Sequence, residues 1–450
     1  MFLVLCTPLL LIIFLSGCKD HKVLDPKQPV TLTLWHNYGG QMKDTMDQMI
    51  DEFNETLGAE TGITINVTSI SSSSTLHEKI TLAVNQDPGA PALPDITTAY
   101  PKTAIKLKEK DLLVDLTQYF SDQELSDYIL NFIEEGKLDD NGLYVFPTAK
   151  STEVLFVNTT IFDRFAKDTG ARLKDLETFE GIMKTAELYY EWSGGKMFYM
   201  PDSLFNVAQI GYKQLGSEFF SEGRLNLSSP LFQRIWNNFY KPAVLGHMAV
   251  FDGYASDLAK TGDIVCSTGS TAGVVFFPPK VTYPDNTTEA ANYAILPYPT
   301  FEDGKKIAIQ RGGGMCVIKS HKQKEYGASV FLKWFTAPEN NLRFVSSTGY
   351  MPVTKEAFGE IMTVRIQNLE DESLKKLLQV VRTMQDEYEF YIPPLYDNLD
   401  DLEREYVTSF KKIASKSRDL YFELLEEMDS EQAYKTVSDG VMQQFINGFK

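Results

Sequence analysis

The chain has 450 residues, 43% of them hydrophobic and 23% charged, a composition that is typical of globular proteins and excludes a disordered chain, a collagen-like fibre and a coiled coil. One hydrophobic core rarely serves so many residues, so we expect two or more lobes. The 61 acidic residues outnumber the 43 basic ones, which gives a net charge of −18. Such a surface repels phosphodiester backbones, and nucleic acid is not an expected partner.

The chain begins with an apolar segment that ends at a cysteine. Residues 2–15 are almost entirely apolar, and this run is shorter than the about 20 residues of a membrane span but suits the core of a signal peptide. It ends in Leu-Ser-Gly-Cys at residues 15–18, which resembles the lipobox of bacterial lipoproteins, although no Lys or Arg precedes it. We therefore predict a signal peptide over residues 1–17, acylation of Cys18 and a polar tether over residues 18–29. A plain membrane anchor and an ordinary signal peptide with a chance cysteine are the alternatives.

The next hundred residues alternate between the period of strands and the period of helices. The predicted elements are strands at residues 30–35, 63–67 and 94–96 and helices at residues 42–53 and 76–83. Their order predicts a parallel sheet with crossover helices. Ligands bind beyond the carboxyl ends of such strands, where residues 35–40 and 95–100 lie.

The rest of the chain mixes further strands with long helical regions. Apolar runs flank the polar stretch of residues 148–153, and helical spacing then dominates up to residue 241. Strand-like runs return at residues 263–267, 293–296 and 307–318, and the pattern from residue 323 onward is almost entirely helical. We find no internal repeat. The body is therefore predicted to be α/β with extra helices, in two lobes whose strands interleave along the chain.

Motifs that carry chemistry are close to absent from the sequence. The five histidines are scattered, the Asp-Asp-Asn-Gly turn at residues 139–142 has Thr148 where a calcium loop needs Glu, and Gly269–Gly273 has Thr where a nucleophile elbow needs Ser. We therefore expect no metal, no cofactor and no catalytic residues.

Two small features leave alternatives open. The glycines at residues 312–314 do not form a phosphate-binding loop; they predict either a close approach to the backbone or a flexible turn. Cys266 and Cys316, the only cysteines of the body, are better explained as two buried thiols than as a disulfide.

Aromatic residues are the positive signal, since they make up 12% of the chain. Most are expected in the core, but five lie in turns beside Gly, Pro, Asn or Asp: Trp35, Tyr38, Tyr100, Tyr350 and Tyr396. Flat rings with a polar edge suit a sugar, whose C–H faces stack and whose hydroxyl groups need polar partners. The alternative is that these rings only cover the ends of the core.

Several segments in the same order resemble one known family. They are Leu34-Trp35-His36-Asn37, Pro94-Asp95-Ile96, the runs at residues 142–147 and 154–158, Thr261-Gly262-Asp263, Tyr298-Pro299, Gly312-Gly313-Gly314, the runs at residues 331–335 and 337–340, and Thr348-Gly349-Tyr350-Met351-Pro352-Val353. Over about residues 30–355 the chain resembles the extracellular solute-binding proteins of family 1, the sugar-binding subunits of ABC importers.

The resemblance implies a type II periplasmic-binding-protein-like fold, with two interleaved α/β lobes joined by a multi-strand hinge and a ligand cleft between them. It implies a first lobe over residues 30–150 and 269–325 and a second lobe over residues 151–268 and 326–450. The polar stretch of residues 148–153 is expected as one hinge crossing and residues 266–270 as another.

The resemblance also implies which residues contact the ligand. The positions carried over are Trp35, His36, Asn37, Tyr38, His77, Ser151, Thr152, Ser270, Gly313 and Tyr350. At His77 relatives often have a carboxylate instead. Tyr100 and Tyr396 are added because of their settings at turns.

The implied function is capture of a sugar or oligosaccharide and its delivery to ABC permease subunits. We expect a monomer that is anchored by lipid to a bacterial cell membrane and faces the periplasm or the cell exterior. A lipid-anchored secreted carbohydrate enzyme, a role in adhesion or sensing, and glycerol-3-phosphate binding within the same family are the alternatives. We expect a neutral saccharide, because the stretch at residues 390–396 has no Arg and only Arg311 is placed to bind a phosphate.

Overall fold

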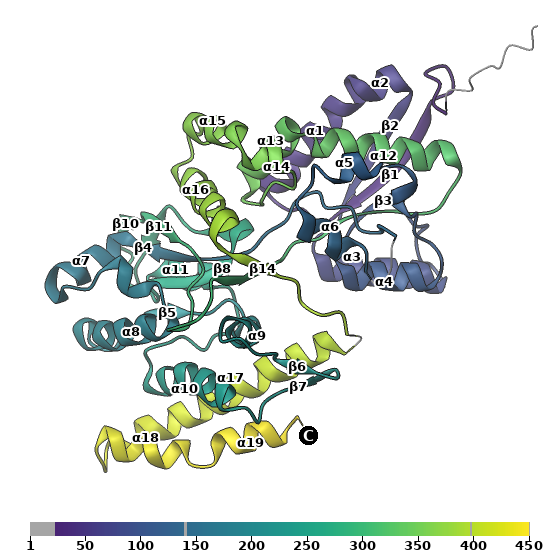
Figure 1. The fold of residues 1–450 in the computed structure, drawn as a ribbon. Coiled ribbons are helices and arrows are strands. Elements are labelled where there is room, and N and C mark those ends of the chain that lie inside the picture. The colour runs from purple at the N-terminus through teal and green to yellow at the C-terminus, as the bar shows by residue number, and fades with distance from the viewer. Residues whose placement is uncertain (1–22, 139–141, 397, 450) are drawn as a thin grey trace, which may run out of the picture.

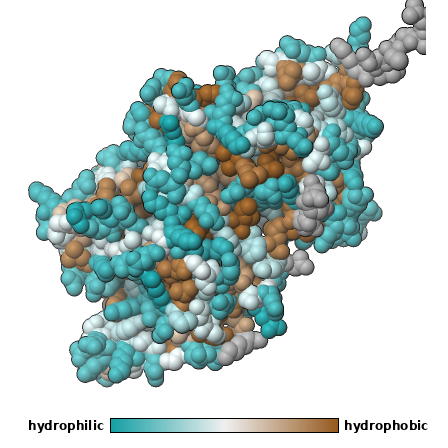
Figure 2. Space-filling model, in the orientation of Figure 1, coloured by the Kyte–Doolittle hydropathy of each residue, from teal (hydrophilic) through white to brown (hydrophobic). Residues whose placement is uncertain are grey.

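The computed structural model describes residues 23–138, 142–396 and 398–449 (Figure 1). The predicted signal peptide and the predicted acylation site at Cys18 lie outside the described residues. Within the described ranges, no helix is long and apolar enough to cross a membrane. Hydrophilic residues cover most of the face shown in Figure 2, interrupted by separate apolar patches.

The first lobe is built on a four-stranded sheet in the order β13-β3-β1-β2. Its strands are β1 (Val30–His36), β2 (Ile63–Ser69), β3 (Ile96–Ala99) and β13 (Gly314–Val317). β1 is parallel to β2 and β3, as predicted, whereas β13 joins from far along the chain and is antiparallel to β3. The carboxyl ends of β1 and β3 therefore meet at one edge of the sheet.

Helices cover this sheet with the apolar faces that their sequences predict. The helices of the first lobe are α1 (Gln41–Glu55), α2 (Leu57–Thr61), α3 (Ser73–Asn85), α4 (Pro101–Glu109), α5 (Asp122–Leu125), α6 (Leu130–Gly136), α12 (Lys322–Thr336) and α13 (Pro338–Thr348), with a 3-10 turn η1 (Leu116–Gln118). The stripe of Met42, Met46, Met49 and Phe53 is buried on α1, which confirms its predicted helical face.

The second lobe is built on another four-stranded sheet, in the order β11-β4-β8-β5. Its strands are β4 (Glu153–Asn158), β5 (Tyr199–Met200), β8 (Cys266–Ser270) and β11 (Tyr293–Leu296). β4 is antiparallel to both β8 and β11, and every residue of β4 is buried. This burial explains why its sequence is a continuous apolar run instead of an alternating one.

Helices and two small hairpins complete the second lobe. They are α7 (Thr159–Thr169), η2 (Leu173–Leu176), α8 (Phe179–Ser193), α9 (Leu204–Gln214), α10 (Pro230–Leu245), α11 (Ala255–Thr261), η3 (Thr271–Phe276), the hairpin β6 (Phe220–Ser221) and β7 (Arg224–Leu225), and the hairpin β9 (Lys280–Thr282) and β10 (Thr288–Ala290). The carboxy-terminal helices α17 (Leu399–Leu424), α18 (Ser430–Ser438) and α19 (Val441–Asn447) pack on this lobe through α10 and α9.

The structure differs from the expected lobe boundaries in two segments. The segment from η3 to β11, within the stretch expected in the first lobe, packs on the second: β11 pairs with β4, and β9 packs on α11. α12 and α13, expected in the second lobe, pack on β1 and α1 of the first. The second crossing is therefore not at residues 266–270, which form the interior strand β8, but at residues 310–313, between β12 (Ile307–Ile309) and β13.

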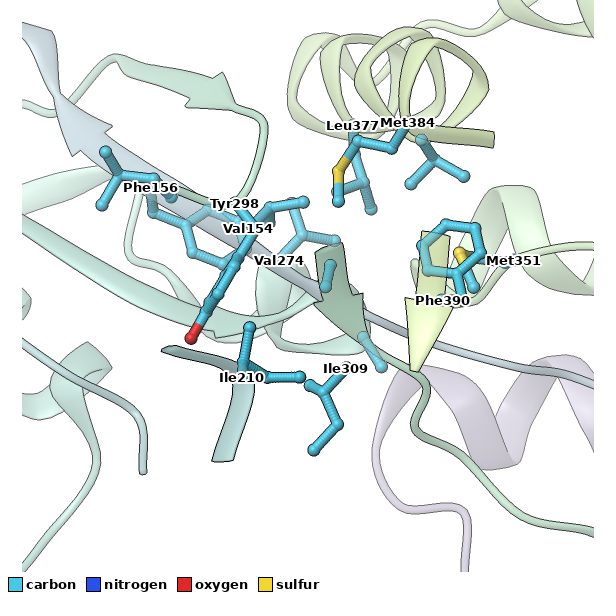
Figure 3. Packing of buried hydrophobic residues seen from close by; sticks show 14 of the residues in the cluster. Val154, Phe156, Ile210, Val274, Tyr298, Ile309, Met351, Leu377, Met384 and Phe390 are labelled. Carbon is cyan, nitrogen blue, oxygen red and sulfur yellow. The ribbon is translucent and has the colours of Figure 1, made fainter. Parts of the chain in front are cut away.

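A third connection runs behind the hinge. It consists of α14 (Lys355–Phe358), α15 (Glu360–Asn368), α16 (Glu372–Glu387) and β14 (Glu389–Tyr391). β14 pairs with β12, and α16 lies against β11 and η3. Figure 3 shows Leu377 and Met384 projecting from α16 toward the buried residues around Val274 of η3, and all three belong to the same hydrophobic core.

The glycines at residues 312–314 are required by a close backbone approach. A Cβ on Gly313 would lie 2.6 Å from the carbonyl oxygen of Ala99, and one on Gly314 would lie 2.3 Å from that of Phe146. Of the two interpretations left open above, close approach is therefore confirmed, and the approaching group is the chain's own backbone.

The two cysteines of the body are free and buried. Cys266 lies on β8 of the second sheet and Cys316 on β13 of the first, so they belong to different lobes. The interpretation as two buried thiols is confirmed.

Gly314→Ala is expected to destabilise the protein by about 1–3 kcal/mol, because β13 must move to admit the added methyl group. Gly273→Ala is the matched control, since no atom lies within 4 Å of a Cβ at that position. Thermal unfolding followed by circular dichroism measures both. Equal melting temperatures for the two variants would contradict the close approach.

Candidate functional site

Three of the predicted aromatic residues come together where the lobes meet. Tyr38 follows β1, and its ring centroid lies 6.0 Å from that of Tyr350. Tyr100 follows β3, begins α4 and is 42% exposed. Burial raises the pKa of Tyr38 and of Tyr350, and the nearby Tyr100 phenol adds to both shifts. We call Tyr38, Tyr100 and Tyr350 the tyrosine cluster.

The residues that precede Tyr38 in the chain are buried or hydrogen-bonded within the first lobe. His36 is fully buried, and its Nδ1 accepts a hydrogen bond of 3.2 Å from the backbone N–H of Tyr38. Burial lowers the pKa of His36 to about 4, so the ring is neutral at pH 7. Asn37 accepts a hydrogen bond of 2.9 Å from the Thr98 hydroxyl, and Trp35 packs on a separate core cluster. These three predicted residues position Tyr38.

The residues predicted at the hinge form hydrogen bonds to other segments of the chain. Ser151 and Arg311 exchange two backbone hydrogen bonds, of 2.9 and 2.7 Å. The Thr152 side chain is fully buried, and its hydroxyl donates to the carbonyl of Ile309 at 2.8 Å. Together with the close approach at Gly313, these contacts fix the crossing segments against each other.

A charge network begins at Arg311, whose side chain turns toward the second lobe. Its Nη1 donates to Glu153 Oε1 at 3.0 Å and to Asp202 Oδ2 at 2.5 Å. Glu153 is the first residue of β4 and pairs in register with Ser270, while Asp202 follows β5. Sequence reasoning missed both carboxylates, although Asp202 comes directly after a strand.

Glu153 has an unusual environment for a carboxylate. The side chain has no exposed surface, and Asn206 donates a hydrogen bond of 2.8 Å to its Oε1. Burial raises the pKa of Glu153 to about 7, and the Arg311 charge opposes this shift. On the first-lobe side of the hinge, Lys150 forms a second ion pair with Glu135 and donates to the carbonyl of Gly312 at 2.8 Å.

Asp202 also lines a small cavity in the second lobe, of about 160 Å³. Ser203, Phe251 and Glu403 lie in the same wall, so the carboxy-terminal helix α17 contributes to it. The Ser203 hydroxyl donates to Glu403 at 3.4 Å, and burial raises the pKa of Glu403. None of the tyrosine cluster lines this cavity; the link between the two is Arg311, which pairs with Asp202 and whose charge acts on the Tyr100 phenol.

Two predicted residues are placed elsewhere. His77 lies on α3, where its Nδ1 is 2.9 Å from the Thr103 hydroxyl and its Nε2 is 3.3 Å from the ammonium of Lys106. The Tyr396 ring packs on Phe220 of the β6–β7 hairpin, with centroids 5.7 Å apart. The contacts described for His77 and Tyr396 join neither residue to the tyrosine cluster.

The comparisons with known proteins agree with this arrangement. A family model described as bacterial extracellular solute-binding protein matches residues 48–366. The chain belongs to this family. The resemblance seen in the sequence is thereby confirmed. A search of curated proteins gives no significant match.

Solved structures of solute-binding proteins confirm the two-lobe α/β fold. The cyclic α-maltosyl-1,6-maltose binding protein of Arthrobacter globiformis aligns with a TM-score of 0.68 at 16% identity, over 93% of this chain and 100% of its own. An ABC substrate-binding protein of Listeria monocytogenes, solved with cycloalternan, aligns with a TM-score of 0.67 at 16% identity, over 94% of this chain and 100% of its own. UgpB of Mycobacterium tuberculosis, solved with glycerophosphocholine, aligns with a TM-score of 0.67 at 16% identity, over 93% of this chain and 99% of its own.

Glu153→Gln is expected to change how the stability of this solute-binding protein depends on pH. Because the folded-state pKa is raised from 4.5 to about 7, the folded chain holds a proton that the unfolded chain releases in this window. Stability therefore falls as pH rises from about 4.5 to 7, by up to about 3 kcal/mol. Gln does not titrate, so the variant should lack this loss.

Melting temperatures at several pH values between 4.5 and 8 measure the effect. Asp163→Asn, at an exposed position of α7, is the matched control and should follow the wild type. Parallel curves for wild type and Glu153→Gln would show that the buried carboxylate does not titrate in this window.

Proposed function

We propose that this protein captures a saccharide between its lobes and delivers it to the membrane permease of an ABC importer. The observation that carries the proposal is the tyrosine cluster beside the Arg311 charge network. Tyr100 is 42% exposed at the carboxyl end of a parallel strand. The Arg311 charge acts on its phenol, and Arg311 pairs with Asp202 of the second lobe. Ring faces and fixed polar groups are the two components that sugar recognition needs.

The charge network argues against a phosphoester. A buried phosphate favours an arginine whose fork is free for bidentate bonds. Arg311 is instead shared between Glu153 and Asp202, so its Nη1 already donates to two carboxyl groups of the chain. The stretch of residues 390–396 contains no arginine, which supports the same conclusion.

Glycerophosphocholine-type binding remains the second candidate, because one similar structure was solved with that ligand. In that case we expect Arg311 to leave its carboxylates when the ligand enters. Hydrolysis of a bound saccharide is the third candidate. We propose binding without turnover, because the chain belongs to a family of binding proteins.

We further propose that the protein acts as a monomer held at the outer face of the membrane by acyl chains on Cys18. The geometry of the first lobe supports an anchor at this end of the chain. The chain enters β1 at Val30, whereas Tyr38 follows the opposite, carboxyl end of that strand. A tether at residues 18–29 therefore reaches the lobe at the edge away from the tyrosine cluster.

A thermal-shift panel tests the ligand class. Neutral di- and oligosaccharides are expected to raise the melting temperature, since a ligand at 100 times its Kd stabilises by about 2.7 kcal/mol. Glycerol-3-phosphate and glycerophosphocholine should not. Tyr100→Ala should weaken binding about tenfold, as expected for loss of one stacked ring and its burial.

Tyr326→Ala is the matched control, because Tyr326 is 40% exposed but lies on α12, outside the tyrosine cluster. Binding of a phosphoester that disappears in Arg311→Ala would show that the second candidate is correct. Release of shorter sugars during incubation with the bound oligosaccharide would favour the enzyme.

Cys18→Ser is expected to move the protein from the membrane fraction to the soluble fraction, because several acyl chains are needed to hold a protein at a bilayer. Fractionation and mass spectrometry of the amino-terminal peptide measure the change. Cys6→Ser, inside the predicted signal peptide, is the control and should leave the mature protein acylated. Acyl chains on the Cys18→Ser protein would contradict the proposal.

A further inference from the structure

An ion pair joins the two lobes close to the tyrosine cluster, because Lys102 lies two residues after Tyr100. Lys102, the second residue of α4 in the first lobe, pairs with Asp400, the second residue of α17 on the second lobe. Both side chains are about half exposed, at 48% and 50%. Figure 1 shows the amino end of α17 reaching toward α4. The pair is therefore made only when the lobes lie close together.

The charges around Lys102 divide by lobe. Lys106, one turn further along α4, repels it from its own lobe, while Asp401 in the first turn of α17 and Glu403 in the next turn attract it. Arg404 of α17 opposes them, but it pairs with Asp401 along its own helix. Burial and Lys106 together lower the pKa of Lys102. Repulsion of Lys102 therefore comes from Lys106 on its own lobe and from Arg404 on α17, whereas the attraction comes only from carboxylates of α17 among the described residues.

Helix dipoles strengthen this division. A cation at the amino end of a helix is unfavourable, because the first turn already carries partial positive charge. Lys102 occupies that place on α4. Asp400 and Asp401, in contrast, are in the favourable place on α17. If the lobes separate, Lys102 loses its counter-charge but still lies at the unfavourable end of the α4 dipole. The carboxylates of α17 are still stabilised by the dipole of their own helix.

We propose that Lys102 and the acidic first turn of α17 form an electrostatic clasp that biases the lobes toward closure in the absence of ligand. In this proposal α17 supplies the carboxylates that attract the first lobe. This helix lies beyond residues 48–366, the part of the chain that the family model matches. Because a ligand that needs the closed form binds in proportion to the closed fraction, the clasp also sets apparent affinity.

The size of the effect follows from the exposure of the pair. Half-exposed ion pairs contribute little and are screened over about 8 Å at physiological salt. We expect loss of the clasp to lower the ratio of closed to open molecules about two- to fivefold. The same loss should occur in the wild type as salt is raised.

Small-angle X-ray scattering of the ligand-free protein tests the clasp without knowledge of the ligand. In 20 mM NaCl, Lys102→Glu should have a larger radius of gyration than the wild type, and Lys102→Gln an intermediate one. The double variant Lys102→Glu/Asp400→Lys, which reverses the pair, should return to the wild-type value. In 500 mM NaCl all four proteins should be equally open.

Lys319→Glu is the matched control, because it makes the same change of net charge at a lysine that pairs with Asp111 inside the first lobe. It should leave the radius unchanged. Unaltered melting temperatures would show that the variants are folded. Equal radii for wild type and Lys102→Glu at low salt, or failure of the reversed pair to restore closure, would overturn the clasp while leaving the proposed ligand untouched.

Discussion

The backbone pairing of Ser151 with Arg311 is the constraint on which the rest of the molecule depends. It joins two crossing segments that are 160 residues apart in the chain and fixes the direction in which the Arg311 side chain leaves the hinge. That direction brings one guanidinium to two carboxylates, Glu153 and Asp202. Burial of an ionised carboxylate without such a partner would be strongly unfavourable. The position of Glu153 therefore depends on the backbone pairing that brings Arg311 to it.

The same constraint explains the composition of the hinge. Gly313 and Gly314 face carbonyl oxygens of the first lobe so closely that no Cβ fits, and Thr152 uses its hydroxyl on Ile309. Small or fully bonded side chains let the crossing segments pack directly on each other. The tyrosine cluster is then left at the edge of this packed region, with Tyr100 open to solvent.

Local periodicity predicted the elements well, because strand and helix faces depend on neighbouring residues. β1, the buried face of α1 and the continuous apolar run of β4 were all visible in the sequence. Sheet membership was not, because it depends on pairing between distant segments. The strand-like run of residues 307–318 shows this most clearly: it holds β12 beside the hinge and β13 in the first lobe, and the chain changes lobes at the polar residues between them.

The site was predictable to the same extent. Aromatic residues in turns indicated Tyr38, Tyr100 and Tyr350, but His36 and Thr152 proved to be supports, and Tyr396 packs on a hairpin. The carboxylates at Glu153 and Asp202 carry no local signature, since their importance comes from Arg311, which is distant in the chain. Aromatic residues that are candidates for ligand contact can be recognised by type and setting, whereas the charged groups near them are recognised only once the fold brings them together.

Under the two proposals, ligand contact and lobe closure depend on different side chains, although Lys102 lies only two residues after Tyr100. The tyrosine cluster belongs to the first lobe and to the loop after α13, while the counter-charge for closure comes from α17, at the far end of the sequence. Contacts made with a ligand and the population of the closed form multiply in the apparent affinity. Changes in the first turn of α17 therefore alter how tightly every ligand is held by a common factor, and changes in the tyrosine cluster alter which ligand is held.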